Sequence, residues 1–310
     1  MPKRDLLNLV SLPLKDLNWI LQRAEDYKKG FVLLRPLENQ SIGLLFEKAS
    51  TRTRVSFDVA ITRMGGHALF LSFDDIQVKR GETIEDTARV LSSYLNGLII
   101  RTYAQEDVET WAKFATIPVI NGLTDRYHPC QILTDLFTIY QKRGPLKGLK
   151  LCYIGDGNNI AHSLLIGGAK CGMDVTIASP RSRKPGKEIV TQAEALAEKS
   201  GGKITLGTKP AKAAEDADVL YTDVWVSMGD EAKAAAIRRS LKSFQINDAL
   251  LSKAKPDCLV MHCLPAHRGD EITDAVMEGP NSVIFEQAAN RLPVQQAILE
   301  FCLKHDHRTH

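Results

Sequence analysis

Five consecutive residues near the start of the chain combine hydroxyl and guanidinium groups. The segment Ser50-Thr51-Arg52-Thr53-Arg54 follows an apolar run and precedes a stretch with helical periodicity. A hydroxyl residue at a helix start can cap the helix, and the free N–H groups and the helix dipole there favour an anion. Two arginines add planar donors that match phosphate oxygens. The segment therefore predicts a phosphate site, and the alternative is an ordinary capped helix with solvated arginines.

Two further segments place polar side chains where a strand ends or a helix begins. His128 precedes Pro129, a residue suited to the first turn of a helix, and Gln131 follows three residues after His128. Residues at this spacing can face the same side. Arg101 ends the apolar segment 97–100, where a cation is costly unless an anion meets it. A hydrogen-bonded core histidine and a salt bridge at the strand end are the respective alternatives.

A glycine-containing turn at 155–159, Gly-Asp-Gly-Asn-Asn, follows an apolar segment of the second half. It does not complete the dinucleotide motif G-x-G-x-x-G/A, because Ile160 occupies the last position. The next apolar segment ends Ile177-Ala178-Ser179-Pro180, without the acidic residue that would hold a ribose hydroxyl. We therefore interpret the segment as a tight turn that exposes Asn159 at the carboxyl edge of a sheet, where ligands of α/β proteins bind.

An acid and a hydroxyl follow another expected strand, in the segment 223–229, Asp-Val-Trp-Val-Ser-Met-Gly. Asp223 suits a substrate ammonium group and Ser227 suits a substrate carboxylate. A plain turn with a cap is the alternative.

His262-Cys263-Leu264-Pro265 also follows an apolar run. Cys263 is open to three interpretations, namely a nucleophile, a metal ligand or a small buried apolar residue. No zinc-like spacing surrounds it, so no metal is expected. The terminal histidines His305, His307 and His310 are interpreted as part of a solvated terminus.

Apolar periodicity alternates between the spacings of strands and helices along the whole chain. In the first half it predicts helices at 13–29, 55–64, 84–95, 107–114 and 129–142, with strands at 42–46, 68–73, 97–100 and 117–121. In the second half it predicts strands at 149–154, 175–178, 203–206, 219–221, 258–261 and 283–285, with helices at 160–171, 187–199, 286–303 and one that Thr208 and Pro210 open. Arg143-Gly144-Pro145 is the expected interdomain linker. The order indicates two α/β domains, each a mostly parallel sheet flanked by helices.

Composition restricts the class of protein further. The 310 residues include 44% hydrophobic and 25% charged residues, which excludes a disordered chain. The balance of 40 basic and 37 acidic residues gives a net charge of +3, too little for a general nucleic-acid or membrane-surface binder. No apolar run approaches the roughly 18–20 residues of a transmembrane helix, and Asp5, Pro13 and Asp16 interrupt any signal-peptide core. The six cysteines form no C-x-x-C pair and are expected to be reduced thiols of a cytoplasmic protein.

Taken together, these segments resemble the aspartate/ornithine carbamoyltransferase family over nearly the whole chain. The resemblance rests on the segments 46–54, 86–92, 128–131, 227–229, 262–265 and 290–291. The first and third of these resemble the whole family. Ser227-Met228-Gly229 and His262-Cys263-Leu264-Pro265 resemble its ornithine branch and discriminate it from the aspartate branch.

The resemblance implies a carbamoyl phosphate-binding domain at 1–143, completed by a returning C-terminal helix in 287–310, and an ornithine-binding domain at 144–286. It implies carbamoyl phosphate contacts from Ser50, Thr51, Arg52, Thr53, Gln77, Arg101, His128, Gln131, Cys263, Leu264 and Arg291. It implies ornithine contacts from Asn159, Asp223, Ser227 and Met228. Among these residues, it assigns catalytic roles to Arg101, His128 and Cys263. Gln77 is expected to reach the site of a neighbouring subunit in a homotrimer.

The reaction implied by the resemblance transfers the carbamoyl group of carbamoyl phosphate to the δ-amine of L-ornithine, giving L-citrulline and phosphate in arginine biosynthesis or catabolism. No cofactor is expected. Three alternatives remain, namely a carbamoyltransferase for a related amine such as putrescine, a non-catalytic binding subunit and a nicotinamide oxidoreductase. A citrulline assay and an NAD-dependent thermal shift discriminate among them.

Overall fold

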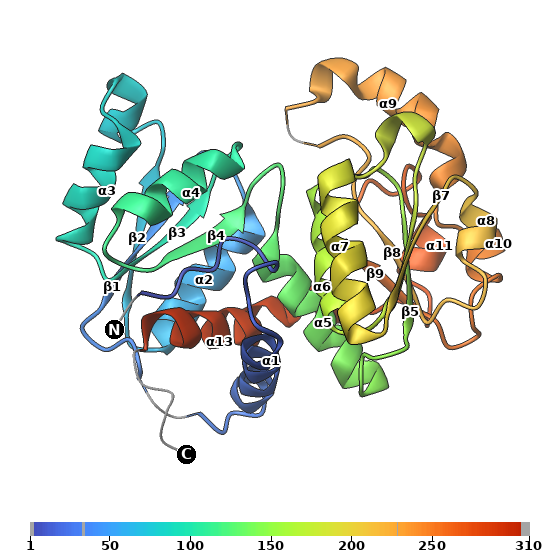
Figure 1. Cartoon of the computed structure of the whole chain (residues 1–310), viewed down its shortest axis with the longest axis horizontal. Helices are drawn as coiled ribbons and strands as arrows, with labels where there is room; N and C mark the ends of the chain where they lie inside the picture. Colours follow the sequence, from blue (N-terminus) through green and yellow to red (C-terminus); the bar gives the residue numbers. More distant parts are fainter. Residues whose placement is uncertain (1–2, 33–34, 228, 305–310) are drawn as a thin grey trace. The chain divides into compact units, whose positions relative to one another are not determined.

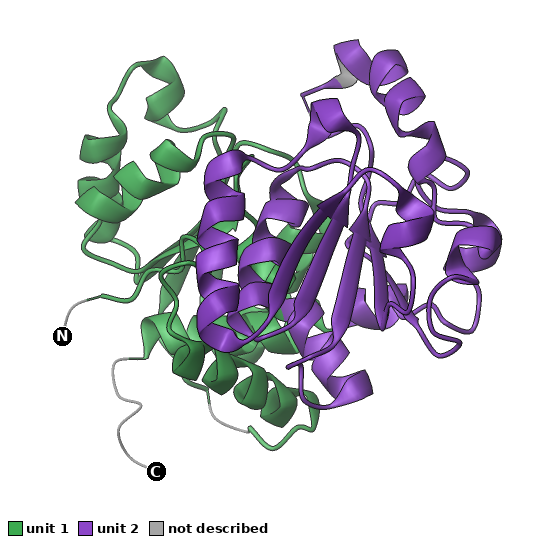
Figure 2. Cartoon of the chain, turned by 45° about the vertical axis from the view of Figure 1, so that its right-hand side comes forward, with its two compact units in different colours: residues 1–133, 290–310 green, residues 134–289 purple. Residues whose placement is uncertain are grey.

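The structure, a computed structural model, describes residues 3–32, 35–227 and 229–304. Contacts within the chain divide it into two compact units, which we call unit 1 (1–133 with 290–310) and unit 2 (134–289) (Figure 2). The dividing position lies inside helix α5 (Pro129–Arg143). The domain limits expected from the sequence place the first boundary after this helix, at 143.

Unit 1 contains a four-stranded parallel sheet in the order β2-β1-β3-β4. Its strands are β1 (Ser41–Phe46), β2 (His67–Ser72), β3 (Gly97–Arg101) and β4 (Val119–Leu123). The inner strands β1 and β3 are buried almost throughout, as expected for parallel strands covered on both faces. Phe46 pairs with Arg101, so both strands end together. The chain order reverses between β1 and β3, and a ligand is expected outside such a switch point.

Helices cover both faces of this sheet. Figure 1 shows α3 (Ile84–Ser92) and α4 (Gln105–Phe114) on one face and α1 (Leu14–Lys28), α2 (Thr51–Arg63) and α13 (Arg291–Leu303) on the other. A short 3₁₀ turn, η1 (Gln77–Arg80), lies between β2 and α3.

Helix α13 returns from the end of the chain to pack against α1 and α2, as expected from the sequence (Figure 1). Glu300 of α13 accepts two hydrogen bonds from the Arg23 guanidinium, at 2.8 and 3.0 Å, and one from the Tyr27 hydroxyl at 2.6 Å. Gly97 of β3 allows the end of α13 to approach, because a Cβ there would lie 2.6 Å from Cδ2 of Leu303. The first and last helices are therefore parts of one core.

Unit 2 contains a five-stranded parallel sheet in the order β7-β6-β5-β8-β9. Its strands are β5 (Lys150–Ile154), β6 (Asp174–Ala178), β7 (Lys203–Gly207), β8 (Val219–Thr222) and β9 (Leu259–His262). The chain order reverses between β5 and β8. The segments that follow these two strands begin at Gly155 and Asp223, and they meet at the switch point of this sheet.

Helices flank both faces of the second sheet as well. Figure 1 shows α6 (Asn159–Lys170) and α7 (Lys187–Ser200) on one face, and α8 (Pro210–Ala213), α10 (Asp248–Leu251) and α11 (Asp274–Met277) on the other. The remaining elements are η2 (Arg181–Arg183), η3 (Glu231–Lys233), α9 (Ala234–Leu241), η4 (Lys242–Phe244) and α12 (Ile284–Ala289). Two mostly parallel sheets with flanking helices confirm the predicted fold class.

The predicted strand at 283–285 is wrong. Ser282 forms an isolated β-bridge with Val260, and the Val283 N–H donates one hydrogen bond to the carbonyl of Val260. Helix α12 then begins at Ile284. A short apolar run does not by itself distinguish a strand from a buried helical turn. The helix predicted at 286–303 is likewise two helices, α12 and α13, separated at Asn290.

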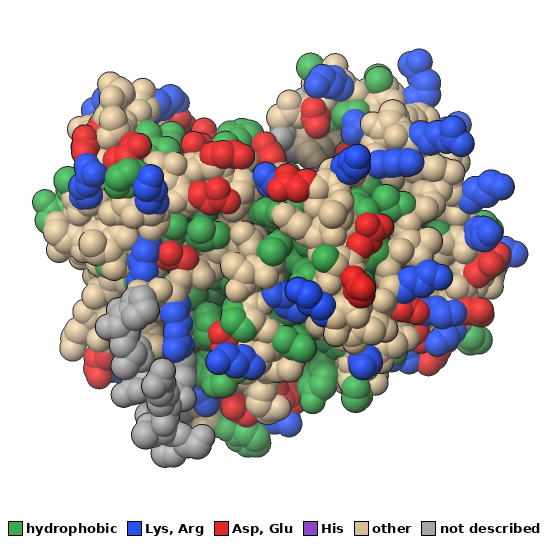
Figure 3. Space-filling model, viewed as in Figure 1, with side chains coloured by type: hydrophobic (Ala, Val, Ile, Leu, Met, Phe, Trp, Pro, Cys, Tyr) green, Lys and Arg blue, Asp and Glu red, His purple; other side chains and the backbone are tan. Residues whose placement is uncertain are grey.

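Other described features match the composition. Lys and Arg side chains lie beside Asp and Glu side chains on the face shown in Figure 3. All six cysteines have free thiols. Among the described residues, no helix is both long and apolar enough to cross a membrane.

Candidate functional site

The first candidate site begins at the N-terminus of α2. Ser50 has an extended backbone, with φ of −160°, and its hydroxyl accepts a hydrogen bond from the Thr53 N–H at 3.2 Å. The predicted cap is thus present. Thr51 and Arg52 form the first turn, which contains no acidic residue. The positive end of the helix dipole is consequently not neutralised from within this turn.

Arg291 joins three elements of unit 1. Its guanidinium donates to the side-chain oxygen of Gln131 at 2.6 Å and to the hydroxyl of Thr53 at 3.3 Å. All three side chains are buried. They come from α13, α5 and α2, which are far apart in the sequence. The structure therefore brings together three residues that the sequence assigned to carbamoyl phosphate.

His128 and Arg101 belong to the same cluster. Both residues are buried, and burial together with the positive charges of Arg291 and Arg101 holds the pKa of His128 well below its ordinary value. The imidazole is therefore neutral near pH 7. Two buried guanidinium groups beside a neutral imidazole form an environment that favours an anion. We call Thr53, Arg101, His128, Gln131 and Arg291 the cationic cluster.

Gln77 is not part of the cationic cluster. It is exposed in η1, and its side-chain oxygen accepts a hydrogen bond from Arg80 at 3.2 Å. The sequence analysis missed Lys48, which is buried, pairs with Asp125 and lies 4.1 Å from the ring centroid of Tyr103. Lys48 lies only four residues before Arg52, and this proximity to the predicted phosphate site could have identified it.

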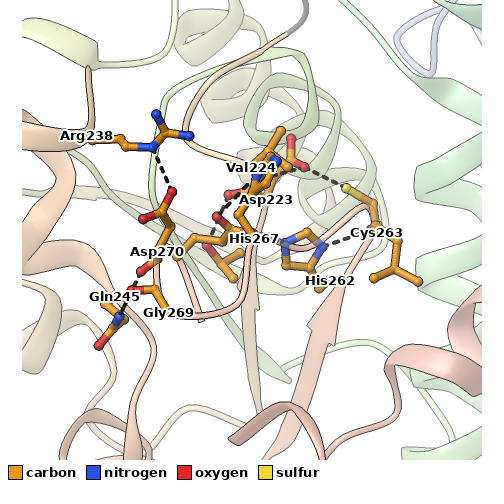
Figure 4. Close-up of polar contacts among 12 residues, drawn as sticks. Asp223, Val224, Arg238, Gln245, His262, Cys263, His267, Gly269 and Asp270 are labelled. Atoms are coloured by element: carbon orange, nitrogen blue, oxygen red, sulfur yellow. Dashed lines mark hydrogen bonds and ion pairs between the residues drawn. The ribbon is translucent and has the colours of Figure 1, made fainter. Parts of the chain in front are cut away.

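The second candidate site is centred on Asp223, directly after β8. One carboxylate oxygen accepts hydrogen bonds from the Val224 N–H at 2.8 Å and the Cys263 thiol at 2.9 Å. The other accepts one from the Asn158 side-chain amide at 2.7 Å. Figure 4 shows the sulfur of Cys263 directed towards Asp223. The ends of β5, β8 and β9 therefore meet at one carboxylate.

The Cys263 thiol is a hydrogen-bond donor in this arrangement. Burial and the adjacent Asp223 carboxylate raise its pKa well above the ordinary value. A thiol that stays protonated is a poor nucleophile and a poor metal ligand. Of the three interpretations left open by the sequence, the geometry favours neither nucleophilic nor metal chemistry and instead gives Cys263 a polar role.

His262 holds the backbone that follows it. Its Nδ1 accepts a hydrogen bond from the Leu264 N–H at 2.8 Å, so the proton of the neutral ring is on Nε2 and is donated to Glu271 at 3.1 Å. Glu271 is fully buried and also accepts from the His267 N–H at 2.5 Å. Leu264 has a φ of +59°, a strained value for a side chain with a Cβ. The sequence analysis missed Glu271, which has no periodic or motif signal.

Contacts from the opposite side fix the same loop. Arg238 of α9 donates to Asp270 at 2.7 Å, and the side-chain amide of Gln245 donates to the carbonyls of Gly269 and Asp270 at 2.7 and 2.9 Å (Figure 4). The segment from Cys263 to Glu271 is thus held at both ends.

A buried network also positions the end of β9. The Asp135 carboxylate accepts hydrogen bonds from the Tyr221 hydroxyl at 2.9 Å and the Gln287 amide at 2.7 Å. The Gln287 oxygen in turn accepts from the His262 N–H at 3.0 Å. The network therefore links α5, β8, β9 and α12 behind the Asp223 site.

Ligand atoms of Asp223, His262 and Cys263 lie within 4.8 Å of one another and could in principle hold a metal ion. Both ring nitrogens of His262 already take part in hydrogen bonds, and the Cys263 thiol is kept protonated. Metal binding would have to break one of these hydrogen bonds and remove the thiol proton. The donor set does not fit a resident metal.

Two of the other residues assigned to ornithine, Asn159 and Ser227, lie in the segments that follow β5 and β8. Asn159 is the first residue of α6, and Asn158 caps this helix through its side-chain oxygen, which accepts from the Ile160 and Ala161 N–H groups. The residue in contact with Asp223 is thus Asn158, whereas the sequence analysis selected only Asn159. Ser227 is half-buried, and its carbonyl accepts from the Asp230 N–H at 3.0 Å. Met228 lies outside the described residues.

Comparison with known proteins finds one family model for each half of the chain. Residues 4–141 match the model described as aspartate/ornithine carbamoyltransferase, carbamoyl-P binding domain. Residues 147–302 match the model described as aspartate/ornithine carbamoyltransferase, Asp/Orn binding domain. The chain belongs to the aspartate/ornithine carbamoyltransferase family.

Individual relatives point to one branch of that family. A Methanosarcina acetivorans protein named ornithine carbamoyltransferase is 53% identical over 300 residues, which cover 96% of this chain and 98% of the relative. A Pyrococcus furiosus protein named anabolic ornithine carbamoyltransferase is 51% identical over 299 residues, which cover 96% and 95%. The solved structure of ornithine carbamoyltransferase from Pyrococcus furiosus matches with a TM-score of 0.95 at 50% identity and covers 98% of both chains.

Proposed function

We propose that this protein is an ornithine carbamoyltransferase, which transfers the carbamoyl group of carbamoyl phosphate to the δ-amine of L-ornithine and releases L-citrulline and phosphate. The observation that carries the proposal is the presence of two sites of opposite charge preference at the switch points of the two sheets. The cationic cluster suits a phosphate, and the carboxylate of Asp223 suits an ammonium group. Relatives at 50% identity and above bear the same name.

The cationic cluster is the proposed site of carbamoyl phosphate. Arg52 and the N–H groups of the first turn of α2 neutralise the phosphate, with Ser50 and Thr51 beside them. Thr53, Arg101 and His128 polarise the carbamoyl carbonyl and stabilise the oxyanion that forms when the amine attacks. A neutral His128 donates a hydrogen bond without adding a further positive charge to those of the arginines.

Asp223 and Cys263 are the proposed partners of ornithine. The amine must lose its proton before it attacks, and a carboxylate with a neighbouring thiol can orient it by hydrogen bonds. Asn159, Ser227 and Met228 are assigned to the amino-acid end of the substrate, and the segment with Leu264 to the carbamoyl group. The oxyanion then collapses and releases phosphate without a covalent enzyme intermediate, and the rate comes mainly from positioning and electrostatics.

The direct test is formation of the carbamoylated amine from carbamoyl phosphate, which is citrulline with ornithine as the acceptor and carbamoylputrescine with putrescine. We expect ornithine to be the better acceptor by kcat/KM, because putrescine lacks the α-carboxylate that Ser227 would bind. Equal rates would indicate the putrescine alternative. Binding of carbamoyl phosphate without any product from either amine would indicate a non-catalytic subunit.

We further propose that the enzyme is a homotrimer of the cytoplasm that serves arginine biosynthesis. Two exposed apolar side chains of unit 1 support self-association, namely Val55 of α2, which is 54% exposed, and Leu69 of the edge strand β2, which is 40% exposed. The exposed position of Gln77 in η1 is consistent with a partner site in a neighbouring subunit. The anabolic name of the Pyrococcus furiosus relative supports the biosynthetic direction.

A further inference from the structure

The segment 179–187, Ser-Pro-Arg-Ser-Arg-Lys-Pro-Gly-Lys, carries four basic residues that the proposed reaction does not use. It follows β6 and contains η2. Three of the basic residues are exposed, whereas Arg183 is half-buried. The Arg183 guanidinium donates to the carboxylate of Asp156 at 2.7 Å, and the two side chains are only 21% and 12% exposed. This ion pair is therefore largely withdrawn from solvent.

Three contacts attach this segment to the turn 155–159 and the helix that follows it. Besides the ion pair, the Gly157 N–H donates to the carbonyl of Arg183 at 2.9 Å. The Gly186 N–H donates to His162 of α6 at 3.1 Å. A Cβ on Gly157 would lie 2.4 Å from the backbone nitrogen of Pro185, so the two backbones approach as closely as only glycine allows.

The turn that is held in this way carries the partner of the ornithine-binding carboxylate. Asn158 caps α6 with its side-chain oxygen and donates from its nitrogen to Asp223 at 2.7 Å. A shift of the turn would therefore move both Asn158 and Asn159 relative to Asp223.

We propose that Arg183 is a positioning residue for ornithine binding: its ion pair with Asp156 holds the turn 155–159, and through Asn158 the carboxylate of Asp223, in the geometry that binds the substrate amine. The inference rests on the proposed function. Arg183 does not touch Asp223, and it acts only through the turn.

Arg183 also compensates the charge of a buried carboxylate near Asp223. Burial raises the pKa of Asp156, Arg183 opposes this rise, and the carboxylates of Asp223 and Asp230 add to it. Without Arg183, a buried carboxylate would remain beside Asp223 with no cation against it. Asp156 would then disturb the site that is meant to attract an ammonium group.

The test compares Arg183→Gln with Arg181→Gln, a matched control that removes an exposed arginine from the same 3₁₀ turn. We expect Arg183→Gln to raise the KM for ornithine by about tenfold and to leave the KM for carbamoyl phosphate within about twofold of wild type. Arg181→Gln should match wild type for both substrates. Citrulline formation by the wild-type enzyme is measured first, because its absence would overturn the proposed function rather than the role of Arg183.

A double variant separates positioning from a general loss of stability. In Arg183→Gln/Asp156→Asn no unpaired buried charge remains, and the two side-chain amides can still form a hydrogen bond that holds the turn, so we expect the KM for ornithine to recover to within about threefold of wild type. Gly157→Ala, which forces the two backbones apart, should raise the KM for ornithine without loss of Arg183. An unchanged KM for ornithine in Arg183→Gln would overturn the inference. So would an equal rise of the KM for both substrates, or no recovery in a double variant that is folded by circular dichroism.

Discussion

Arg52 and Arg54 lie two positions apart in the first turn of α2 but in different surroundings. Arg52 is half-buried, whereas Arg54 is exposed and lies 3.5 Å from the ring centroid of Phe70. We expect Arg52→Ala to lower kcat/KM for carbamoyl phosphate, because the phosphate would lose a charge-assisted hydrogen-bond partner. The expected loss of transition-state stabilisation is about 2–5 kcal/mol. Arg54→Ala should have little effect. Steady-state kinetics check both, and a loss of less than about tenfold in Arg52→Ala would contradict the phosphate assignment.

Asp223→Asn tests the assignment of the second site. The amide keeps the shape of the carboxylate and loses its charge, so the variant should bind ornithine less well. Carbamoyl phosphate should bind nearly as it does to wild type, because the cationic cluster belongs to unit 1. Calorimetric titration with carbamoyl phosphate alone and kinetics with ornithine measure the two effects separately. A parallel loss of both ligands would indicate that Asp223 is structural.

The pH dependence follows from which groups titrate. Burial and two nearby arginines keep the pKa of His128 well below its ordinary value, and burial with Asp223 keeps the pKa of Cys263 well above its own. His128 therefore stays neutral and Cys263 stays protonated between about pH 7 and 9, whereas an alkyl amine with a pKa near 10.4 is mostly protonated there. We therefore expect the apparent KM for ornithine to fall as the pH rises towards about 9. A flat profile would contradict amine attack as the governing step.

Site residues that follow a strand or open a helix could be predicted from the sequence. Ser50, Arg101, His128 and Asp223 each stand at such a boundary, where α/β proteins bind ligands. The buried network behind the Asp223 site could not be predicted, because it depends on how distant segments pack. Asp135 and Gln287 form a buried hydrogen bond across 152 residues of sequence.

At the scale of elements, apolar periodicity predicted the helices and strands best where a segment was long or bounded by glycine and proline. The prediction failed at 283–290, where a short apolar run resembled a strand and a single helix was expected to follow. Pro293 was an overlooked signal, because proline is tolerated in the first turn of a helix and indicates a new start there. Helix α13 begins directly after the break at Asn290, and its first residue, Arg291, belongs to the cationic cluster.

The packing of α13 on α1 gives an element-scale prediction through Glu300. Burial raises the pKa of this carboxyl group, but hydrogen bonds from Arg23 and Tyr27 outweigh burial and lower it overall. A lowered pKa in the folded state contributes stability above the unfolded value of about 4.3, and this contribution is lost as the pH falls through the folded value. Glu300→Gln should therefore lower the free energy of unfolding at pH 7 by about 1–3 kcal/mol. This range is below that of a fully buried ion pair, because the Arg23 side chain is partly exposed to solvent.

Denaturant unfolding followed by fluorescence is a suitable measurement, since Trp19 of α1 lies 6.1 Å from Phe301 of α13 between ring centroids. Glu38→Gln is the matched control, because its pair with Arg35 is exposed and should contribute less than about 1 kcal/mol. The difference between wild type and Glu300→Gln should shrink below about pH 4. Equal stability of the two proteins at pH 7 would show that the triad does not hold α13 to α1.

At the scale of the whole molecule, the proposed trimer would complete each site with a residue from the next subunit. The loop 74–83 contains Gln77, which the structure leaves exposed with a hydrogen bond to Arg80. Two interpretations of the loop are to be separated by experiment, namely a surface loop without a partner function and the intersubunit contact that the family resemblance implies. Size measurement by light scattering decides first whether the protein is a trimer in solution.

Mixing two inactive variants then tests whether Gln77 acts in trans. In homotrimers of Arg52→Ala or of Gln77→Ala, every site lacks one part and activity should be weak. In mixed trimers, some sites would combine an intact Arg52 from one subunit with an intact Gln77 from its neighbour, although no chain is intact. Unfolding the two variants and refolding them together should therefore yield more activity than the sum of the separately refolded samples. If native mass spectrometry detects mixed trimers and the activity is only the sum, Gln77 acts within its own subunit or has no role in catalysis.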